Sequence, residues 1–206
     1  MKHFCTAGPV KADLHYMIPP LERIDLDAVL TLIDQQKYFV LHAPRQTGKT
    51  SCLLALAAEL NRLGRYRALY FNVEGAQAAR DNQTEAIRSI LSVLANEAEV
   101  RLGDSFPDRM RDEALLRSGP NDALREVLFR WSAQSPLPIC LLIDEIDALV
   151  GDSLITVLRQ LRAGYAGRPS HFPQSVILCG VRDVRDYRIH GTKEIITGGS
   201  AFNIKA

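Results

Sequence analysis

The sequence predicts an α/β protein of three layers, in which helices cover both sides of a mainly parallel sheet. Two observations support this prediction. Short apolar stretches alternate along the chain with longer segments whose apolar residues recur every three or four positions. Several of the short stretches are apolar throughout, as expected for strands that are covered on both faces. Parallel strands joined through helices then give the three layers.

Five short apolar stretches are expected to be the strands of this sheet. They are Tyr38–His42, Arg67–Val73, Ile139–Ile143, Ser175–Cys179 and Ala201–Lys205. Since the last stretch stands at the end of the sequence, we expect the core to be truncated near its fifth strand.

Helical spacing of apolar residues predicts the segments between the strands. These helices run over Leu26–Gln35, Lys49–Leu63, Thr84–Leu102, Asp122–Ala133 and Ser153–Ala163. Asp25 and Asn121 precede two of them and are the expected N-caps. The segment Gly103–Pro120 is polar and interrupted by proline, so we expect a surface excursion with one short helix.

The bulk composition is that of one soluble domain. The chain has 206 residues, of which 47% are hydrophobic and 24% charged, and this length suffices for a single core. We expect residues 1–36 to form an N-terminal extension with a leading helix, and residues 37–206 to form the core. The formal net charge of +1 excludes a general attraction to nucleic acid or anionic lipid. Without a long apolar run or secretory leader, we expect a cytoplasmic location and no membrane partner.

The eight residues APRQTGKT, from Ala43 to Thr50, lie between the first strand and the following helix. A strand, a loop of small residues, Gly-Lys-Thr and a helix form the context of a P-loop, whose backbone N–H groups bind phosphate. The first position of this pattern is alanine here instead of glycine. Gly48 lets the backbone approach the phosphates, Lys49 would contact the β- and γ-phosphates, and Thr50 would bind Mg²⁺. The expected nucleotide-binding residues are Ala43, Pro44, Arg45, Gln46, Thr47, Gly48, Lys49, Thr50 and Ser51.

The third strand ends in an acidic pair, in the sequence LLIDEID. Asp144 would stand at the carboxyl edge of the sheet, where it is the expected second residue of the Mg²⁺ site. Glu145 follows and would orient or deprotonate an attacking water molecule. A glutamate at this position favours hydrolysis over transfer to a substrate hydroxyl group. For Asp147 we expect a solvated acid that caps a helix.

With these two motifs, the sequence resembles the P-loop ATPases of the AAA+/STAND group, particularly prokaryotic AAA-like ATPases related to the archaeal ATPase and Orc/Cdc6 families. The resemblance covers nearly the whole chain. It implies a single P-loop NTPase domain with sheet order 5-1-4-3-2, and ATP or ADP with Mg²⁺ as cofactors. It also implies a homo-oligomer or a partner protein in the active state. The helical lid of these families is expected to be absent from these residues.

The resemblance also implies roles for individual residues. The segment PPLERIDLDAVLTLI looks like the box before the P-loop, which makes Arg23 a contact of the adenine. The segment VILCGVR is similar to the sensor-1 strand, which makes Arg182 a catalytic contact of the γ-phosphate. Asn72 matches a polar residue that can hold the catalytic glutamate away, although a strand cap explains it equally well. The arginines in the region that supplies a finger to a neighbouring subunit are Arg159, Arg162 and Arg168.

Three functions stay open on this basis. The first is an ATPase that switches or powers a larger machine and is slow in isolation. The second is a nucleotide-gated signalling or scaffold module with little turnover, and the third is a DNA-associated, initiator-like ATPase. The stretch Val181–Lys193 alternates arginine with aspartate, which favours a self-paired surface segment over a nucleic-acid site. The implied sheet order puts Cys140 and Cys179 on neighbouring strands, where both are expected to be buried and reduced.

Overall fold

A parallel sheet of five strands forms the centre of the computed structural model, which describes residues 2–4, 13–181 and 204–205. The strands are β1 (Tyr38–His42), β2 (Arg67–Asn72), β3 (Ile139–Asp144), β4 (Ser175–Gly180) and β5 (Ile204–Lys205). They lie in the order β2-β3-β4-β1-β5, which is 5-1-4-3-2 when counted from the opposite edge. All four neighbouring pairs are parallel.

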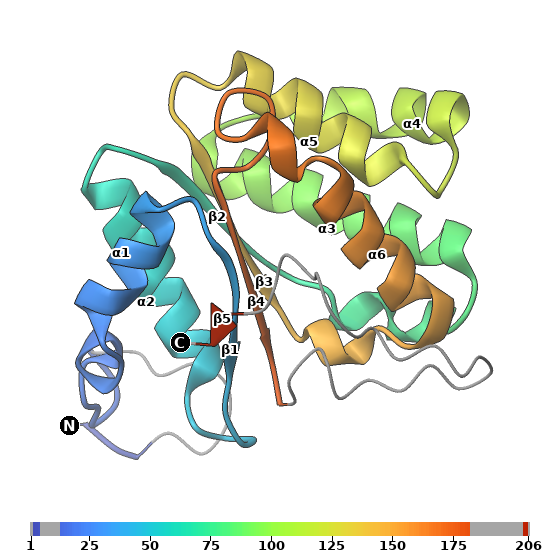
Figure 1. Cartoon of the computed structure of the whole chain (residues 1–206). Coiled ribbons are helices and arrows are strands. Elements are labelled where there is room, and N and C mark those ends of the chain that lie inside the picture. The colour runs from blue at the N-terminus through green and yellow to red at the C-terminus, as the bar shows by residue number, and fades with distance from the viewer. Residues whose placement is uncertain (1, 5–12, 182–203, 206) are drawn as a thin grey trace.

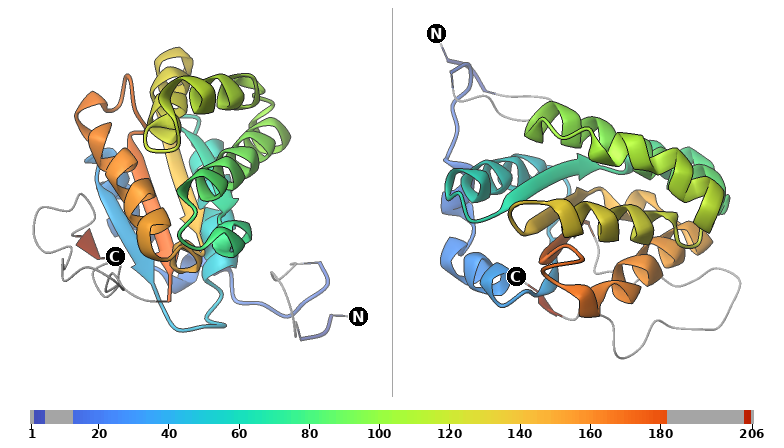
Figure 2. Two further views of the ribbon diagram at one scale, coloured as in Figure 1. Left: turned by 90° about the vertical axis from the view of Figure 1, so that its right-hand side faces the viewer. Right: turned by 90° about the horizontal axis from the view of Figure 1, so that it is seen from above.

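Helices cover both faces of this sheet, which confirms the predicted three layers (Figure 1). The first face carries α1 (Leu26–Asp34) and α2 (Lys49–Arg62). The second face carries α3 (Gln83–Leu102), α5 (Ala123–Gln134) and α6 (Gly151–Ala163). A further helix, α4 (Phe106–Ser118), packs on α3 and α5, outside the layer that touches the sheet. The two views in Figure 2 show the same division of the helices.

Alternate residues of β1, β2, β3 and β4 enter two separate hydrophobic clusters. In β3, Cys140 and Leu142 pack toward α1 and α2, whereas Leu141 and Ile143 pack toward the other helices. All six residues of β3 are buried. A strand covered on both faces has no exposed side to mark with polar residues, and this is why the segment is apolar without alternation.

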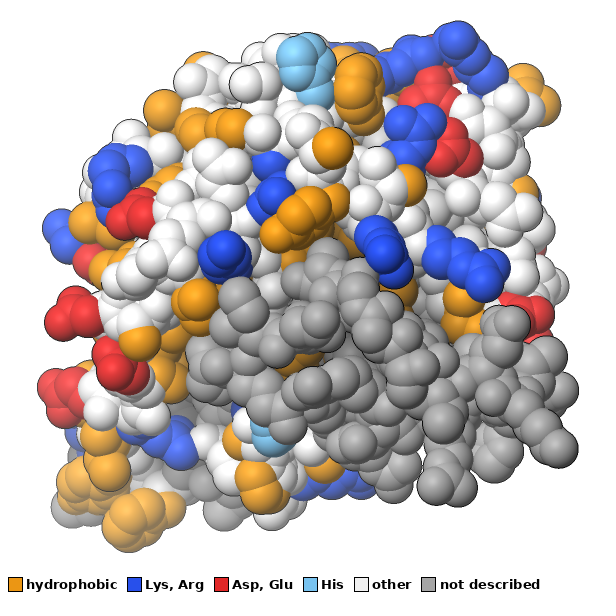
Figure 3. Space-filling view, in the orientation of Figure 1, with side chains coloured by type: hydrophobic (Ala, Val, Ile, Leu, Met, Phe, Trp, Pro, Cys, Tyr) orange, Lys and Arg blue, Asp and Glu red, His pale blue; other side chains and the backbone are white. Residues whose placement is uncertain are grey.

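Four short 3₁₀ turns complete the described elements. They are η1 (Pro20–Arg23), η2 (Glu74–Ala79), η3 (Ile146–Ala148) and η4 (Tyr165–Gly167). On the face that Figure 3 shows, basic side chains lie among acidic and apolar ones, in keeping with the small net charge. Within the described part of the chain, no helix is long and apolar enough to cross a membrane.

One helix is longer than expected, and one expected N-cap was wrong. The segment expected to be a surface excursion with one short helix contains α4, a helix of 13 residues. Because α4 packs on other helices, it fully buries only Pro107 and Ala114, and its sequence therefore lacks a broad apolar face. The residue before α5 is Asp122 and not Asn121, and its carboxylate pairs with Arg125 instead of capping the helix.

Candidate functional site

The carboxyl ends of β1 and β3 bring the two predicted motifs together at the lower edge of the sheet in Figure 1. β1 leads through residues 43–48 into α2, and Thr50 lies in the first turn of that helix. β3 ends at Asp144. The Thr50 hydroxyl donates a hydrogen bond of 2.7 Å to Asp144 Oδ2. The two residues proposed for Mg²⁺ are thus in direct contact.

The loop between β1 and α2 has a glycine where the backbone requires one. Gly48 precedes α2 with a φ of +80°, in the left-handed region. A Cβ atom at this position would overlap the guanidinium of Arg23. The Thr47 hydroxyl donates to the Pro44 carbonyl over 2.8 Å and closes the loop. The first N–H groups of α2 have no acceptor within the helix, so the start of α2 suits an anion.

The side chain of Lys49 folds back over the same loop. Its ammonium group donates to the carbonyl oxygens of Ala43, at 2.8 Å, and of Pro44, at 2.9 Å. The positive charge therefore lies beside the backbone that would surround the phosphates. Ser51 follows in the first turn of α2 and is partly buried, while Arg45 and Gln46 are exposed at the tip of the loop.

Asp144 is completely buried, and hydrogen bonds stabilise its carboxylate. Oδ2 accepts from Thr50 and, over 3.1 Å, from the hydroxyl of Tyr70 on β2. Oδ1 accepts from the backbone N–H of Glu145 over 3.0 Å. A hydroxyl and a carboxylate are the hard oxygen donors that Mg²⁺ prefers, so the residues present fit this ion.

Glu145 occupies a strained position directly after β3. Its φ of 56° and ψ of 40° are left-handed, which is uncommon for a residue with a side chain. Burial raises the pKa of its carboxyl group above the usual value, and the negative charges of Asp144, Asp147 and Glu74 raise it further. The charge of Lys49 opposes this shift. A carboxylate of raised pKa is a stronger base, which suits proton transfer from water.

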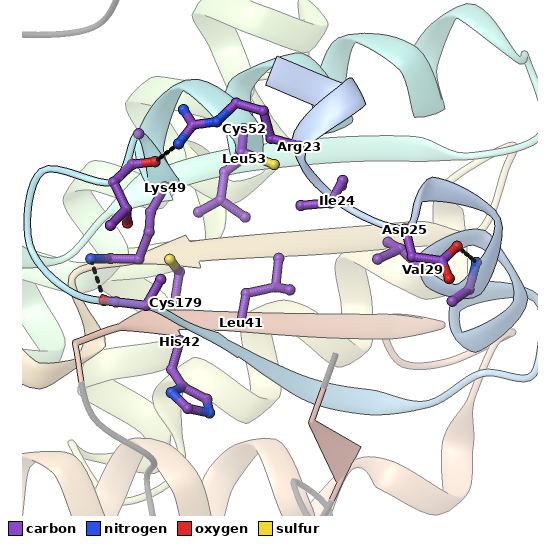
Figure 4. A pocket seen from close by; sticks show the side chains of 14 residues that line it. Arg23, Ile24, Asp25, Val29, Leu41, His42, Lys49, Cys52, Leu53 and Cys179 are labelled. Carbon is purple, nitrogen blue, oxygen red and sulfur yellow. Dashed lines mark hydrogen bonds between the residues drawn. The ribbon is translucent and has the colours of Figure 1, made fainter. Parts of the chain in front are cut away.

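A pocket of about 420 Å³ extends from the loop to the start of α1 (Figure 4). Lys49 and Arg23 lie toward the loop, and the middle of the pocket is lined by Leu41 and Leu53. Ile24, Val29 and Asp25 lie toward α1. One end is thus basic and the rest largely apolar, a division that suits a phosphorylated ligand with an apolar group.

Other residues singled out in the sequence have mixed outcomes. Arg23 ends η1, lines the pocket and donates a hydrogen bond to the Thr47 carbonyl. The side chain of Asn72 accepts from the N–H of Glu74 over 2.7 Å, which is the strand-capping alternative. Arg182 lies outside the described residues, as do Cys5 and nearly all of the stretch that alternates arginine with aspartate.

Among the three candidate arginine fingers, Arg168 is already engaged. Its guanidinium donates to the carbonyl oxygens of Gln36 and Tyr165 and stacks 3.2 Å from the centroid of the Tyr165 ring. It therefore holds the loop before β4, and its role as an arginine finger stays a prediction. Arg159 and Arg162 are exposed on α6.

Asp147 was expected to be solvated, and this expectation was wrong. It is partly buried in η3, and its Oδ2 accepts from the backbone N–H of Val181 over 3.2 Å. The other oxygen, Oδ1, is buried without a hydrogen-bond partner in the structure as described. A Cβ on Gly180 would lie only 2.7 Å from Oδ1. Asp147 thus connects the turn after β3 to the end of β4.

Sequence reasoning also missed Tyr70. Tyr70 stands opposite Leu142 on the neighbouring strand. Leu142 lies two residues before Asp144, so the side chains of Tyr70 and Asp144 share a face of the sheet. A hydroxyl group in an apolar strand, two residues before its end, was the available signal.

A family model described as an AAA domain matches residues 33–187. A search of curated proteins gave no match. Among solved structures, a DNA replication initiation factor is 16% identical with a TM-score of 0.46, over 84% of this chain and 42% of that one. PCH-2 from C. elegans is 16% identical with a TM-score of 0.42, over 87% of this chain and 40% of that one. The chain spans about two fifths of the length of these two structures.

Proposed function

Because the chain belongs to the AAA domain family of P-loop ATPases, we propose that it binds ATP with Mg²⁺ and hydrolyses it to ADP and phosphate. The observation that carries this proposal is the 2.7 Å hydrogen bond between Thr50 and Asp144, the residue that directly precedes Glu145 in the sequence. In this proposal the domain acts as a STAND-like switch or as a motor part of a larger protein or assembly. A single NTPase domain over residues 1–206 is part of the same proposal.

Binding would use the two ends of the pocket differently. The loop N–H groups and Lys49 would hold the β- and γ-phosphates, and Arg23 would lie beside the nucleotide. The base would pack against Leu41 and Leu53. Thr50 and Asp144 would hold Mg²⁺. The bound ion would neutralise charge on the β- and γ-phosphates.

Glu145 would take a proton from the attacking water. The water oxygen forms a bond to the γ-phosphorus while the bond to the bridging oxygen breaks, and ADP leaves. Arg182 remains the proposed contact of the γ-phosphate. A second cation from Arg159 or Arg162 of another copy, or from a partner protein, would complete the site. We therefore expect slow hydrolysis by the isolated chain, since such an arginine contributes on the order of 10³–10⁵ in rate.

Phosphate release by Glu145→Gln tests the proposal. A general base contributes about 10²–10⁴ in rate, so release should fall at least about 100-fold while ADP binding is retained. Glu99→Gln, which changes an exposed acid on α3, is the matched control and should keep most of the turnover. Unchanged release by Glu145→Gln would reject the catalytic role and leave a nucleotide-gated module. Rapid turnover by dilute monomer would reject the need for a second arginine.

A further inference from the structure

The hydroxyl of Tyr70 reaches the proposed Mg²⁺ site from the neighbouring strand. Tyr70 lies on β2, and its side chain is only 7% exposed. Its ring packs with the cluster under α1 and α2, and the guanidinium of Arg101 lies 5.3 Å from the ring centroid. The hydroxyl donates to Asp144 Oδ2 over 3.1 Å. The ring is therefore fixed by packing, and only its hydroxyl touches the site.

This hydrogen bond constrains how Asp144 can turn. Oδ1 is held by the N–H of Glu145, and Oδ2 is shared by the hydroxyls of Thr50 and Tyr70. The Thr50 hydroxyl would have a second task, because its oxygen would face the metal. The Cys179 thiol also hydrogen-bonds to Asp144, and the Tyr70 hydroxyl holds Oδ2 without a second task of this kind. Groups that orient a metal ligand in this way commonly affect metal affinity about 10- to 100-fold.

We propose that Tyr70 is a positioning residue, which fixes the Asp144 carboxylate in the orientation that Mg²⁺ requires. This proposal rests on the proposed function, since it assumes that nucleotide binds together with Mg²⁺. Tyr70 touches neither nucleotide nor metal. It acts through Asp144, so its loss should weaken Mg²⁺ binding and leave metal-free nucleotide binding intact.

The test is an equilibrium titration of the full chain with ADP, first in the presence of EDTA and then at rising Mg²⁺ concentration. Tyr70→Phe removes the hydroxyl and keeps the ring. Tyr66→Phe is the matched control, because the Tyr66 hydroxyl bonds to Asp34, away from the site. The two quantities measured are the ADP affinity without metal and the Mg²⁺ concentration that gives half of the metal-dependent gain in affinity.

We expect Tyr70→Phe to need about ten times more Mg²⁺ than the unaltered chain, with unchanged affinity for ADP in EDTA. Tyr66→Phe should match the unaltered chain both in its affinity for ADP in EDTA and in its Mg²⁺ requirement. An unchanged or lower Mg²⁺ requirement in Tyr70→Phe would overturn the proposal. A loss of ADP binding in EDTA would also overturn it, because the residue would then support the pocket in general. If the unaltered chain bound no ADP, the proposed function itself would fail.

Discussion

Replacing Gly48 by alanine tests how the phosphate loop depends on its backbone. The chain offers a matched control, since Gly48 precedes α2 and Gly64 follows it. Both have a positive φ, +80° at Gly48 and +68° at Gly64. A Cβ on Gly64 would meet nothing within 4 Å, whereas one on Gly48 would overlap the Arg23 guanidinium. Both substitutions therefore strain the backbone through the positive φ, but only Gly48→Ala also creates an overlap with Arg23.

The magnitudes follow from this difference. A left-handed residue with a side chain costs roughly 1–2 kcal/mol, and this applies to both glycines. At Gly48 the guanidinium of Arg23 must also move and lose its bond to the Thr47 carbonyl. Because Arg23 is exposed, this adds only about 0.5–1 kcal/mol. Gly64→Ala should thus lower the free energy of unfolding by about 1–2 kcal/mol, and Gly48→Ala by about 1.5–3 kcal/mol.

Urea denaturation and ADP titration of both variants measure these effects. Gly64→Ala should keep its affinity for ADP, whereas Gly48→Ala should lose at least about tenfold, because its Cβ stands where the backbone meets phosphate. Combining Gly48→Ala with Arg23→Ala should recover the part of the destabilisation that comes from their overlap. Equal destabilisation and equal ADP affinity in the two alanine variants would refute the reasoning.

Two further predictions concern titrating groups. Burial and three neighbouring carboxylates raise the pKa of Glu145, so the acidic limb of the pH–rate profile should lie above the titration of an ordinary glutamate. Glu74→Gln removes one of these negative charges, so it should lower the pKa of Glu145 and move the acidic limb to lower pH. If the acidic limb did not move, a group other than Glu145 would be responsible for it. Burial raises the pKa of Cys140 to about 12 and raises that of Cys179 as well, so both thiols should react much more slowly with alkylating reagents in the native protein than after unfolding. Rapid labelling of either thiol in the native protein would contradict their places in the sheet.

The sequence was most informative where a local pattern determines an element. β1 begins and ends at the predicted residues, Tyr38 and His42, and α2 begins at Lys49 as predicted. A strand that is buried on both faces is apolar throughout, and a P-loop glycine stands directly before its helix. The length and bounds of α4, expected only as one short helix, could not be predicted in this way, because α4 touches other helices along a narrow strip and leaves Leu116 91% exposed.

The residues of the candidate site also differ in how far a local pattern predicts them. Lys49, Thr50 and Asp144 follow from motifs that are continuous in sequence. Tyr70 and Asp147 do not, because their contacts depend on which strands are neighbours and on how the turn after β3 is folded. A period-two pattern gives the face on which a side chain lies, but not the residue that it meets across the sheet. Only the tertiary structure supplies that information.

The close approach of Gly180 to Asp147 has a mechanical consequence. The turn that carries Glu145 and the exit of β4 are packed so tightly that a side chain on Gly180 would have to displace the side chain of Asp147. The hydrogen bond from Val181 to Asp147 joins the same two segments. We therefore expect a movement of the turn to shift the point where the chain leaves β4, at Gly180 and Val181.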